Sequence, residues 1–240
     1  MSNNYFQFKQ FTVFHDRCSM KVNTDGVLLG AWADADNISR ALDVGTGSGF
    51  IALMIAQRSE AMIDAVEIDP PAALQACENA GHSPWKDRIH VHAGSFQNFA
   101  SNSGMKYDLI VSNPPFFRNS LKPSDKRRSK ARHDLSLTLE ELLKGTVSLL
   151  DPQGRLCLIL PYQEKDGFAE LASIYRLHCK RITEVRTTPG TVFSRVLMSF
   201  GPVPSGTPDR TELTLHEADG SYSDDYHELT KDYYLFKINE

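Results

Sequence analysis

The chain has 240 residues, 41% of them hydrophobic, and a formal net charge of −4. A domain of this length buries roughly 70–75% of its unfolded surface, so neither disulfides nor a metal are needed to hold the fold. The four cysteines are far apart and form no Cys-x-x-Cys pair, which argues against a zinc or redox centre and predicts reduced thiols. The polar start and the lack of an apolar run of roughly 18 residues predict a cytoplasmic protein without a signal peptide or membrane span.

Residues 1–30 combine aromatic and basic side chains. Phenylalanines alternate with Lys9, His15 and Arg17, a mixture that can stack on bases and hold phosphates. Burial in a core would explain the same phenylalanines equally well. Next, Thr24-Asp25-Gly26 precedes an apolar run and predicts a turn or helix N-cap, with Asp25 at the positive end of the helix.

A strand is predicted at 41–44, followed by the glycine loop Gly45-Thr46-Gly47-Ser48-Gly49. From residue 50 onward, apolar residues recur three to four apart, which predicts a helix. Glycines in such a loop permit positive φ and close approach of a ligand, and free amides at the helix start favour electron-rich atoms. The dinucleotide fingerprint needs a small residue at the position of Phe50, so a nicotinamide cofactor is disfavoured.

The next predicted strand, 62–67, ends on a carboxylate. Glu67 lies 18 residues beyond Gly49, close to the spacing of a ribose-binding acid. A carboxylate there can accept hydrogen bonds from both ribose hydroxyls. A solvated acid at a strand terminus is the alternative interpretation, and the neighbouring glycine loop favours the ribose role.

The most informative motif is Asn113-Pro114-Pro115-Phe116, which follows the apolar run 107–112. Two consecutive prolines lack amide hydrogens and fix φ near about −65°, so the turn is stiff and its carbonyls stay unpaired. An asparagine amide beside such a carbonyl offers acceptors to a planar amino group, and Phe116 can stack on the ring that carries it. Alone, the motif could equally be a stiff surface turn.

A basic segment follows directly. Seven lysines and arginines between Arg118 and Arg132, against the single acid Asp125, give a net charge of +6. This local charge suits a phosphate backbone, although a solvated loop without a partner is the general alternative.

The remaining chain continues to alternate between strands and helices, which predicts a parallel sheet covered on both faces. The further strands are predicted near 89–93, 154–160 and 211–216, and the further helices near 70–80, 137–150 and 224–236. Asp151-Pro152-Gln153-Gly154 predicts a turn, and 201–208 a connector.

Together, the glycine loop, Glu67 and the Asn113–Phe116 motif resemble S-adenosylmethionine-dependent methyltransferases acting on planar amino nitrogens. The chain is similar to one subfamily in particular, the bacterial tRNA adenine-N6 methyltransferases, which modify the adenine 3′ of the anticodon in a valine tRNA. The similarity rests on Phe8-Lys9-Gln10-Phe11, His15-Asp16-Arg17, residues 21–32, Ser83-Pro84-Trp85 and Tyr233-Tyr234-Leu235-Phe236.

The resemblance implies an α/β fold, a doubly wound Rossmann-like class I methyltransferase sheet that is mostly parallel and ends in an antiparallel hairpin near 178–187 and 192–200. It implies one methyltransferase domain over 1–240. Residues 1–30 would admit substrate and cofactor, 31–200 would form the core sheet, and 201–240 would add a strand and a helix.

The expected activity is methylation of the N6 amino group of adenine 37 in tRNA1(Val). S-adenosyl-L-methionine would be the cofactor and S-adenosyl-L-homocysteine the product, with no metal, no membrane association and no obligatory protein partner. The catalytic candidates are Asn113, Pro114, Pro115 and Phe116. The cofactor candidates are Lys21, Thr24, Asp25, Asp43, Gly45, Thr46, Gly47, Gly49, Glu67, Ile68 and Ser95. The RNA-binding candidates are Lys9, Arg17, Arg118, Lys122, Lys126, Arg127, Arg128, Lys130 and Arg132.

One position departs from the family pattern. Where the family tends to place an acid that binds the cofactor's adenine amino group, this chain has Ser95, whose hydroxyl would bind that group more weakly. A helix N-cap is an equally good interpretation of Ser95.

Other acceptors with amino nitrogens stay open, since similar pockets act on ribosomal RNA guanine-N2, protein glutamine-N5 and DNA adenines. A non-enzymatic module that binds S-adenosylmethionine for a partner is a further alternative. His90 and His92 share a strand face but lack a third ligand, so we interpret them as polar side chains at the protein surface.

Overall fold

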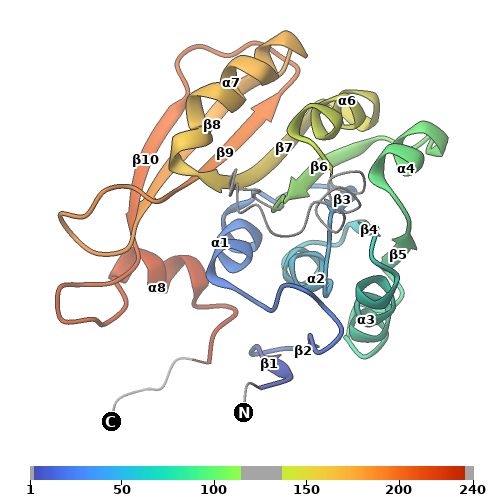
Figure 1. The fold of residues 1–240 in the computed structure, drawn as a ribbon, viewed down its shortest axis with the longest axis horizontal. Coiled ribbons are helices and arrows are strands. Elements are labelled where there is room, and N and C mark those ends of the chain that lie inside the picture. Colours follow the sequence, from blue (N-terminus) through green and yellow to red (C-terminus); the bar gives the residue numbers. More distant parts are fainter. Residues whose placement is uncertain (1–2, 115–136, 236–240) are drawn as a thin grey trace, which may run out of the picture.

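The computed structural model describes residues 3–114 and 137–235. Its larger sheet consists of β3 (Arg40–Val44), β4 (Met62–Glu67), β5 (Ile89–Ala93), β6 (Tyr107–Ser112), β7 (Leu150–Pro161), β8 (His178–Arg186), β9 (Arg195–Gly201) and β10 (Asp209–Thr214). The strand order is β10-β8-β9-β7-β6-β3-β4-β5 (Figure 1). Strands β3 to β7 pair in parallel, whereas β9 is antiparallel to β7 and β8. The predicted α/β class, with a mostly parallel sheet and an antiparallel hairpin, is confirmed.

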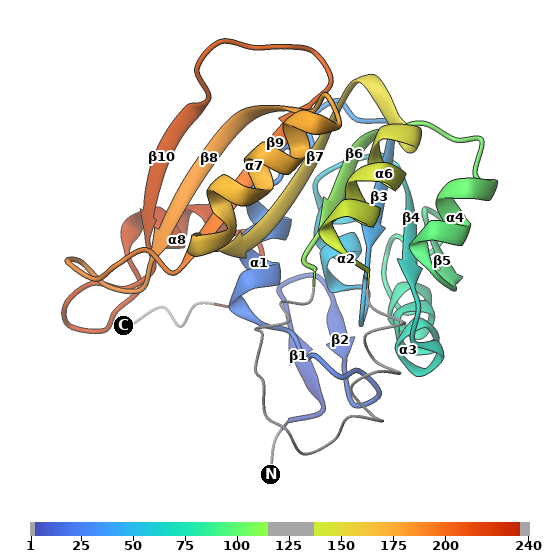
Figure 2. The ribbon, with the colours of Figure 1, turned by 45° about the horizontal axis from the view of Figure 1, so that its top comes forward.

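Helices cover both faces of this sheet (Figure 2). The helices are α1 (Thr24–Trp32), α2 (Phe50–Gln57), α3 (Pro70–Gly81), α4 (Phe96–Asn102), α6 (Leu139–Leu149), α7 (Lys165–Ile174) and α8 (Asp224–Thr230), with a short 3-10 turn at Tyr162–Glu164. Side chains of α1, α2 and α3 pack in one apolar core, and those of α4, α6 and α7 in the other. Both faces of each central strand are therefore buried, which explains why these strands are continuous apolar runs.

Strand β6 shows how one strand serves both cores. Leu109 and Val111 belong to the core beside α1 and α2, whereas Ile110 belongs to the core beside α6. Successive side chains of a strand point to opposite faces, so a run of aliphatic residues fills both layers. The strand ends where the apolar run ends, and Asn113 is the first residue beyond it.

The largest differences from the predicted boundaries lie at residues 151–154 and after Thr230. The segment predicted as a turn, Asp151–Gly154, belongs to β7, where the pairing partners of Tyr107 and Leu109 jump from Leu150 to Arg155. The turn chemistry is still present locally, because the Gln153 amide donates to the Asp151 carboxylate at 2.9 Å. The terminal helix predicted over 224–236 ends at Thr230.

Glycine is needed at the bulge in β7. A Cβ on Gly154 would come within 2.6 Å of the Tyr107 carbonyl oxygen, so no larger residue fits without moving β6 or β7.

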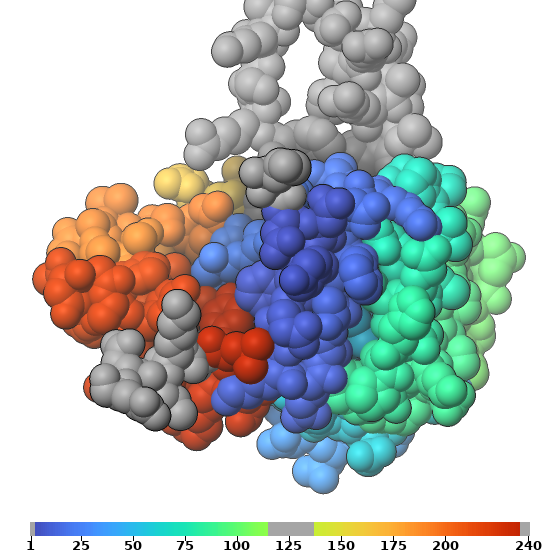
Figure 3. All heavy atoms as spheres, turned by 90° about the horizontal axis from the view of Figure 1, so that it is seen from below, coloured from blue at the N-terminus to red at the C-terminus, as the bar shows by residue number. Residues whose placement is uncertain are grey.

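The N- and C-terminal segments lie side by side (Figure 3). The amino-terminal strands β1 (Tyr5–Gln7) and β2 (Thr12–Phe14) form a separate antiparallel ribbon. The Lys9 amide donates to the Tyr233 carbonyl at 2.8 Å and so joins this ribbon to the segment after α8. Phe8 and Phe11 are buried there, so burial accounts for these two rings.

A helix that crosses a bilayer needs about 20 consecutive, mostly apolar residues. Within residues 3–114 and 137–235, no helix is long and apolar enough to span it.

Candidate cofactor and substrate site

Three predicted motifs meet at the carboxyl ends of adjacent strands. Val44, the last residue of β3, pairs with Val66 of β4 on one side and with Ser112 of β6 on the other. Paired strands lie about 4.8 Å apart. The glycine loop, Glu67 and Asn113 therefore emerge next to one another at one edge of the sheet, which is where open α/β sheets bind ligands.

The glycine loop has the backbone that its sequence predicts. Gly45, Gly47 and Gly49 all have positive φ, with values of 74°, 57° and 83°. A Cβ on Gly47 would meet no atom of the described chain within 4 Å, so the loop faces open space at this residue. A Cβ on Gly49 would instead lie 3.2 Å from Ala76, which brings α3 close to the start of α2. Gly47 thus leaves room for a ligand, and Gly49 permits the close packing of α2 and α3.

Glu67 connects the loop to the next strand end. One carboxylate oxygen accepts the Gly47 amide hydrogen at 2.8 Å, and the other accepts the Asp69 amide hydrogen at 2.9 Å. The side chain is 9% exposed. Two backbone amides therefore fix the carboxylate, and each oxygen keeps a lone pair for a further donor.

Asp43 and Thr46 support the loop from the interior. Asp43 is fully buried and accepts the Thr46 hydroxyl hydrogen at 2.6 Å. Burial raises the pKa of the Asp43 carboxyl to about 7, and the bond from Thr46 partly offsets this rise. Both side chains point into the protein, so their observed contacts hold the loop in place, and direct contact with a cofactor stays a prediction.

Asn113 and Pro114 follow β6 at the same carboxyl edge of the sheet as the glycine loop and Glu67. The preceding residue, Ser112, is fully buried and its hydroxyl donates to the Val44 carbonyl at 2.9 Å, which anchors the end of β6 to β3. Asn113 is half-buried and Pro114 is buried. Pro115 and Phe116 lie outside the described residues, so their predicted roles stay untested.

Two of the three cofactor candidates near α1, Lys21 and Asp25, form bonds to other residues of the protein. The N-cap is Asn23, whose side chain accepts the Gly26 amide hydrogen at 2.9 Å, so the helix starts at Thr24 as its first residue. Asp25 lies in the first turn as predicted and forms an ion pair with Arg195 at 2.8 Å. Lys21 donates to the Asn3 carbonyl at 3.4 Å.

Arg195 was missed by the sequence interpretation. It begins β9, and no local pattern links it to α1, 170 residues away.

Two further cofactor candidates follow β4 and β5. Ile68 is 41% exposed directly after Glu67, so its apolar side chain is accessible to a ligand. Ser95 is the N-cap of α4, and its hydroxyl accepts the Asn98 amide hydrogen at 3.2 Å. The N-cap interpretation of Ser95 is therefore confirmed, while a contact with adenine stays a prediction.

The RNA-binding candidates divide into two groups. Lys9 donates to the Lys231 carbonyl at 2.5 Å, and Arg17 pairs with Glu78 at 2.8 Å, so both make internal contacts. The other candidates, Arg118, Lys122, Lys126, Arg127, Arg128, Lys130 and Arg132, lie outside the described residues.

Asn79 is a supporting residue that the sequence did not indicate. This side chain, 1% exposed on α3, donates to the Ser48 carbonyl of the glycine loop at 2.8 Å. It also donates to the Phe14 carbonyl at 2.8 Å and accepts the Phe14 amide hydrogen at 3.0 Å. One amide thus fixes both the glycine loop and the end of β2. The only signal was a polar residue, four positions after the equally polar Gln75, among the alanines of this helix.

Replacing Asn79 with alanine is expected to lower the free energy of unfolding by about 2–3 kcal/mol, because buried backbone groups lose their partners. Urea denaturation followed by circular dichroism measures this loss. The control is Asn98→Ala, on the exposed side of α4, which should change stability by less than about 0.5 kcal/mol. Equal stability of both variants would contradict the role of Asn79.

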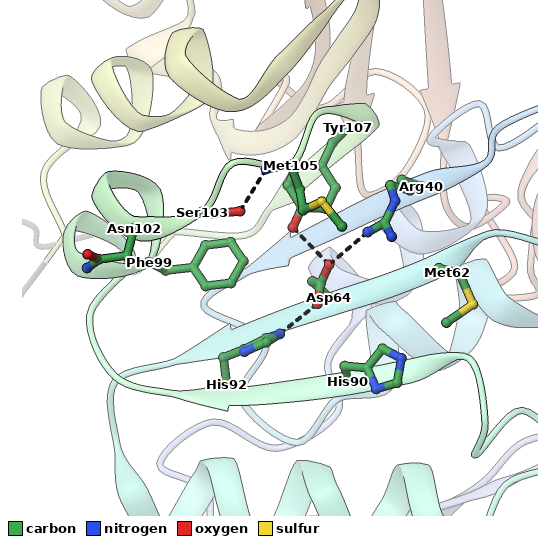
Figure 4. Close-up of a pocket in the computed structure, with 10 residues that line it drawn as sticks. All are labelled: Arg40, Met62, Asp64, His90, His92, Phe99, Asn102, Ser103, Met105 and Tyr107. Carbon is green, nitrogen blue, oxygen red and sulfur yellow. Dashed lines mark hydrogen bonds and ion pairs between the residues drawn. The ribbon is translucent and has the colours of Figure 1, made fainter.

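A cavity of about 540 Å³ lies elsewhere (Figure 4). Asp64 is at its centre: it pairs with His92 at 2.6 Å and accepts the Tyr107 hydroxyl hydrogen at 2.8 Å. Burial raises the pKa of the Tyr107 hydroxyl, and the hydrogen bond to the Asp64 carboxylate raises it further. Tyr107 begins β6 and Arg40 begins β3, so this cavity lies toward the amino-terminal ends of the strands, away from Gly45 and Asn113. We interpret the cluster as a polar network that joins β4, β5 and β6.

The two histidines also line this cavity. In the described part of the chain, no group of three or more His, Cys, Asp or Glu side chains is arranged to hold a metal ion.

Comparison with known proteins gives consistent results. Residues 21–174 match the family "Methyltransferase small domain". The tRNA1(Val) (adenine(37)-N6)-methyltransferase of Bacteroides thetaiotaomicron is 49% identical, and that of Parabacteroides distasonis 46%; each alignment covers 98% of this chain and 99% of the relative. A crystal structure of a predicted O-methyltransferase from Agrobacterium tumefaciens shares the fold, with a TM-score of 0.65 at 18% identity over 87% of this chain and 96% of that one.

Proposed function

This chain belongs to the tRNA1(Val) (adenine(37)-N6)-methyltransferase family, and from that premise we propose that it methylates the N6 amino group of adenine 37 in tRNA1(Val). The observation that carries the proposal is the meeting of the glycine loop, Glu67 and Asn113-Pro114 at neighbouring strand ends. The proposal includes a cytoplasmic location, where tRNA is found and which the sequence also predicts.

The residues at this edge fit S-adenosylmethionine as cofactor. The open space beside Gly45 and Gly47 lets a ligand approach the loop backbone. Glu67 is oriented by two amides and retains lone pairs for the ribose hydroxyls. When bound, S-adenosylmethionine supplies an electrophilic methyl group on a sulfonium centre. We assign Gly45, Gly47, Glu67 and Ile68 as direct contacts, with Asp43, Thr46 and Gly49 supporting the loop.

The task of the protein is to make the adenine amino nitrogen nucleophilic, because its lone pair is delocalised into the ring. We assign the Asn113 side-chain oxygen and the Pro114 carbonyl as acceptors of the two amino hydrogens. Two such bonds draw the nitrogen toward tetrahedral geometry and aim its lone pair at the methyl carbon. Positioning and preorganised dipoles of this kind supply several kcal/mol. Phe116 would stack on the base, which must leave the nucleotide stack to reach the cofactor.

The decisive experiment identifies the methylated product. Purified protein is incubated with tritiated S-adenosylmethionine and total RNA from a strain that lacks the enzyme, and the labelled nucleoside is identified by mass spectrometry. We expect N6-methyladenosine at one position of one tRNA. Label in ribosomal RNA as N2-methylguanosine, or in protein glutamine when a protein extract of the same strain replaces the RNA, would support the alternative acceptors instead. Cofactor binding without any transfer would indicate a non-enzymatic module.

We further propose that the basic segment 118–132 binds the RNA backbone. Replacing Arg127 and Arg128 with alanine is expected to flatten the dependence of log affinity on log salt by about 1.4, if both contact single-stranded phosphates. Filter binding at several salt concentrations measures the slope. As a matched control, Arg176→Ala and Arg210→Ala remove two exposed arginines from elsewhere on the surface. The same slope in all three proteins would remove this segment from the RNA interface.

A further inference from the structure

A second described cavity, of about 370 Å³, lies where the two ends of the chain meet. The residues that line it are the aromatic Phe6, Tyr222 and Tyr234, the polar Gln7, Asn23 and Thr24, and the aliphatic Val22 and Leu235. Tyr222 is 48% exposed, so part of its side chain is accessible from solvent. The volume of the cavity falls in the range of small-molecule sites.

The aromatic lining is ordered by contacts between distant segments. The Phe6 and Tyr234 rings are 5.9 Å apart, and Tyr234 contacts Tyr226 of α8 through a hydroxyl–hydroxyl bond of 3.2 Å. Tyr222 stacks on His216 with ring centroids 4.9 Å apart. These packed rings therefore have little rotamer freedom left to lose on binding a ligand.

This cavity is linked to the proposed cofactor loop through α1 and α2. Asn23 caps α1, and Thr24 is the first residue of that helix. Two residues further along, Gly26 packs directly on the Phe50 ring, where a Cβ would clash. Phe50 follows Gly49 and begins α2. The helix that carries the polar wall of the cavity thus packs, two residues beyond Thr24, on the side chain that follows the glycine loop.

We propose that this cavity binds an unstacked nucleobase that neighbours the target adenine in the same RNA strand. The inference rests on the proposed function and adds a second base site to it. Sequence-specific RNA recognition commonly splays bases out of single-stranded loops and stacks them on aromatic side chains. Three rings provide the stacking surface, and side-chain amides and a hydroxyl provide partners for the base edge.

The polar side chains retain capacity for such a ligand. Asn23 uses one amide hydrogen for the Lys21 carbonyl, and its oxygen for the Gly26 amide. The second amide hydrogen remains for a base acceptor. Gln7 accepts the Thr12 hydroxyl hydrogen at 2.5 Å and keeps one lone pair on the same oxygen. This mixture of flat apolar surface and edge polarity matches a base better than an aliphatic side chain.

The test removes the base and the ring separately and then together. Full-length tRNA is assembled by ligation with the nucleotide 5′ or 3′ of the target adenine made abasic, and methyl transfer is measured for the wild type and Tyr222→Ala. For the wild type, one of the two abasic substrates should raise KM about tenfold, as expected for loss of one stacked base. Tyr222→Ala should raise KM about tenfold on intact tRNA. On the abasic substrate to which the wild type is sensitive, the KM of Tyr222→Ala should rise by less than about twofold above its value on intact tRNA.

Three further measurements keep the outcome unambiguous. Tyr222→Phe retains the ring and should behave as the wild type, and Phe6→Leu, which keeps apolar volume, should reproduce Tyr222→Ala. Binding of S-adenosylhomocysteine should be unchanged in all variants, which excludes an effect through the cofactor. A 2-aminopurine at the sensitive position should lose fluorescence on binding to the wild type and retain it with Tyr222→Ala.

Two results would overturn the base site: no KM effect of either abasic substrate, or abasic and Tyr222→Ala effects that multiply independently. In both cases the wild type still methylates intact tRNA, so the proposed function would stand. Failure of the wild type to methylate any RNA would instead overturn the proposed function and the base site with it.

Discussion

An Asn113→Ala variant is expected to lose about 10²–10³-fold in kcat while binding S-adenosylhomocysteine as tightly as the wild type. The reason is that the side-chain oxygen is assigned to an amino hydrogen of the substrate and to no cofactor atom. Removal of one preorganised polar group at a reacting centre typically has an effect of this size. The residue lies at the end of β6, where Ser112 is tied to β3, so truncation should leave the strand in place. Single-turnover methyl transfer and calorimetric cofactor binding measure the two quantities.

The controls for this experiment separate chemistry from folding. Asn113→Asp keeps oxygen acceptors at the same distance from the backbone and should retain more activity than Asn113→Ala. Asn98→Ala removes an exposed asparagine from α4 and should be indistinguishable from the wild type. Turnover of Asn113→Ala within about threefold of the wild type would refute the assigned role.

Replacing Glu67 with glutamine is expected to weaken cofactor binding by about 10²-fold, which corresponds to about 2.7 kcal/mol. The carboxylate accepts hydrogen bonds from the Gly47 and Asp69 amides, and a glutamine NH₂ group would confront one of these donors with another donor. The variant therefore disturbs the loop as well as the proposed ribose contact. Titration calorimetry with S-adenosylhomocysteine measures the dissociation constant.

A neutral substitution at a remote acid serves as the control for Glu67. Glu60 is a suitable position, since its side chain is 96% exposed and its nearest cation, Arg88, is 3.9 Å away. Glu60→Gln should bind the cofactor normally. If a folded Glu67→Gln protein bound S-adenosylhomocysteine within threefold of the wild type, Glu67 would have no place in the ribose site.

The sequence predicted those parts of the site that depend on local backbone chemistry. Positive φ at the glycine loop follows from the residue type, and the loop adopts it at each of its three glycines. The spacing from this loop to Glu67 equals one helix and one strand, so the acid had to emerge beside it once the two strands were parallel neighbours. Asn113 reaches the same edge because it directly follows β6, the third of these apolar strands.

The boundary errors arose where local and long-range preferences conflict. Asp151-Pro152-Gln153-Gly154 has turn residues and makes a turn-like bond, yet pairing with β6 on either side keeps these residues within β7. Similarly, the aromatic residues after Thr230 continue an apolar pattern, although α8 ends there and the segment packs against the amino-terminal ribbon instead.

The amino-acid sequence by itself determined the sheet class, the glycine loop, the acid at residue 67 and the asparagine-proline corner, because each depends on residue type and on strand or helix periodicity within a short stretch. Only the tertiary structure decided that Asn79 ties the glycine loop to β2, that Asp25 pairs with Arg195, and that Phe6, Tyr222 and Tyr234 line one cavity. The pairs Asn79–Ser48, Asp25–Arg195 and Phe6–Tyr234 are 31, 170 and 228 positions apart in the chain. Their partners are selected by the packing of whole elements, for which a single sequence carries no local signal.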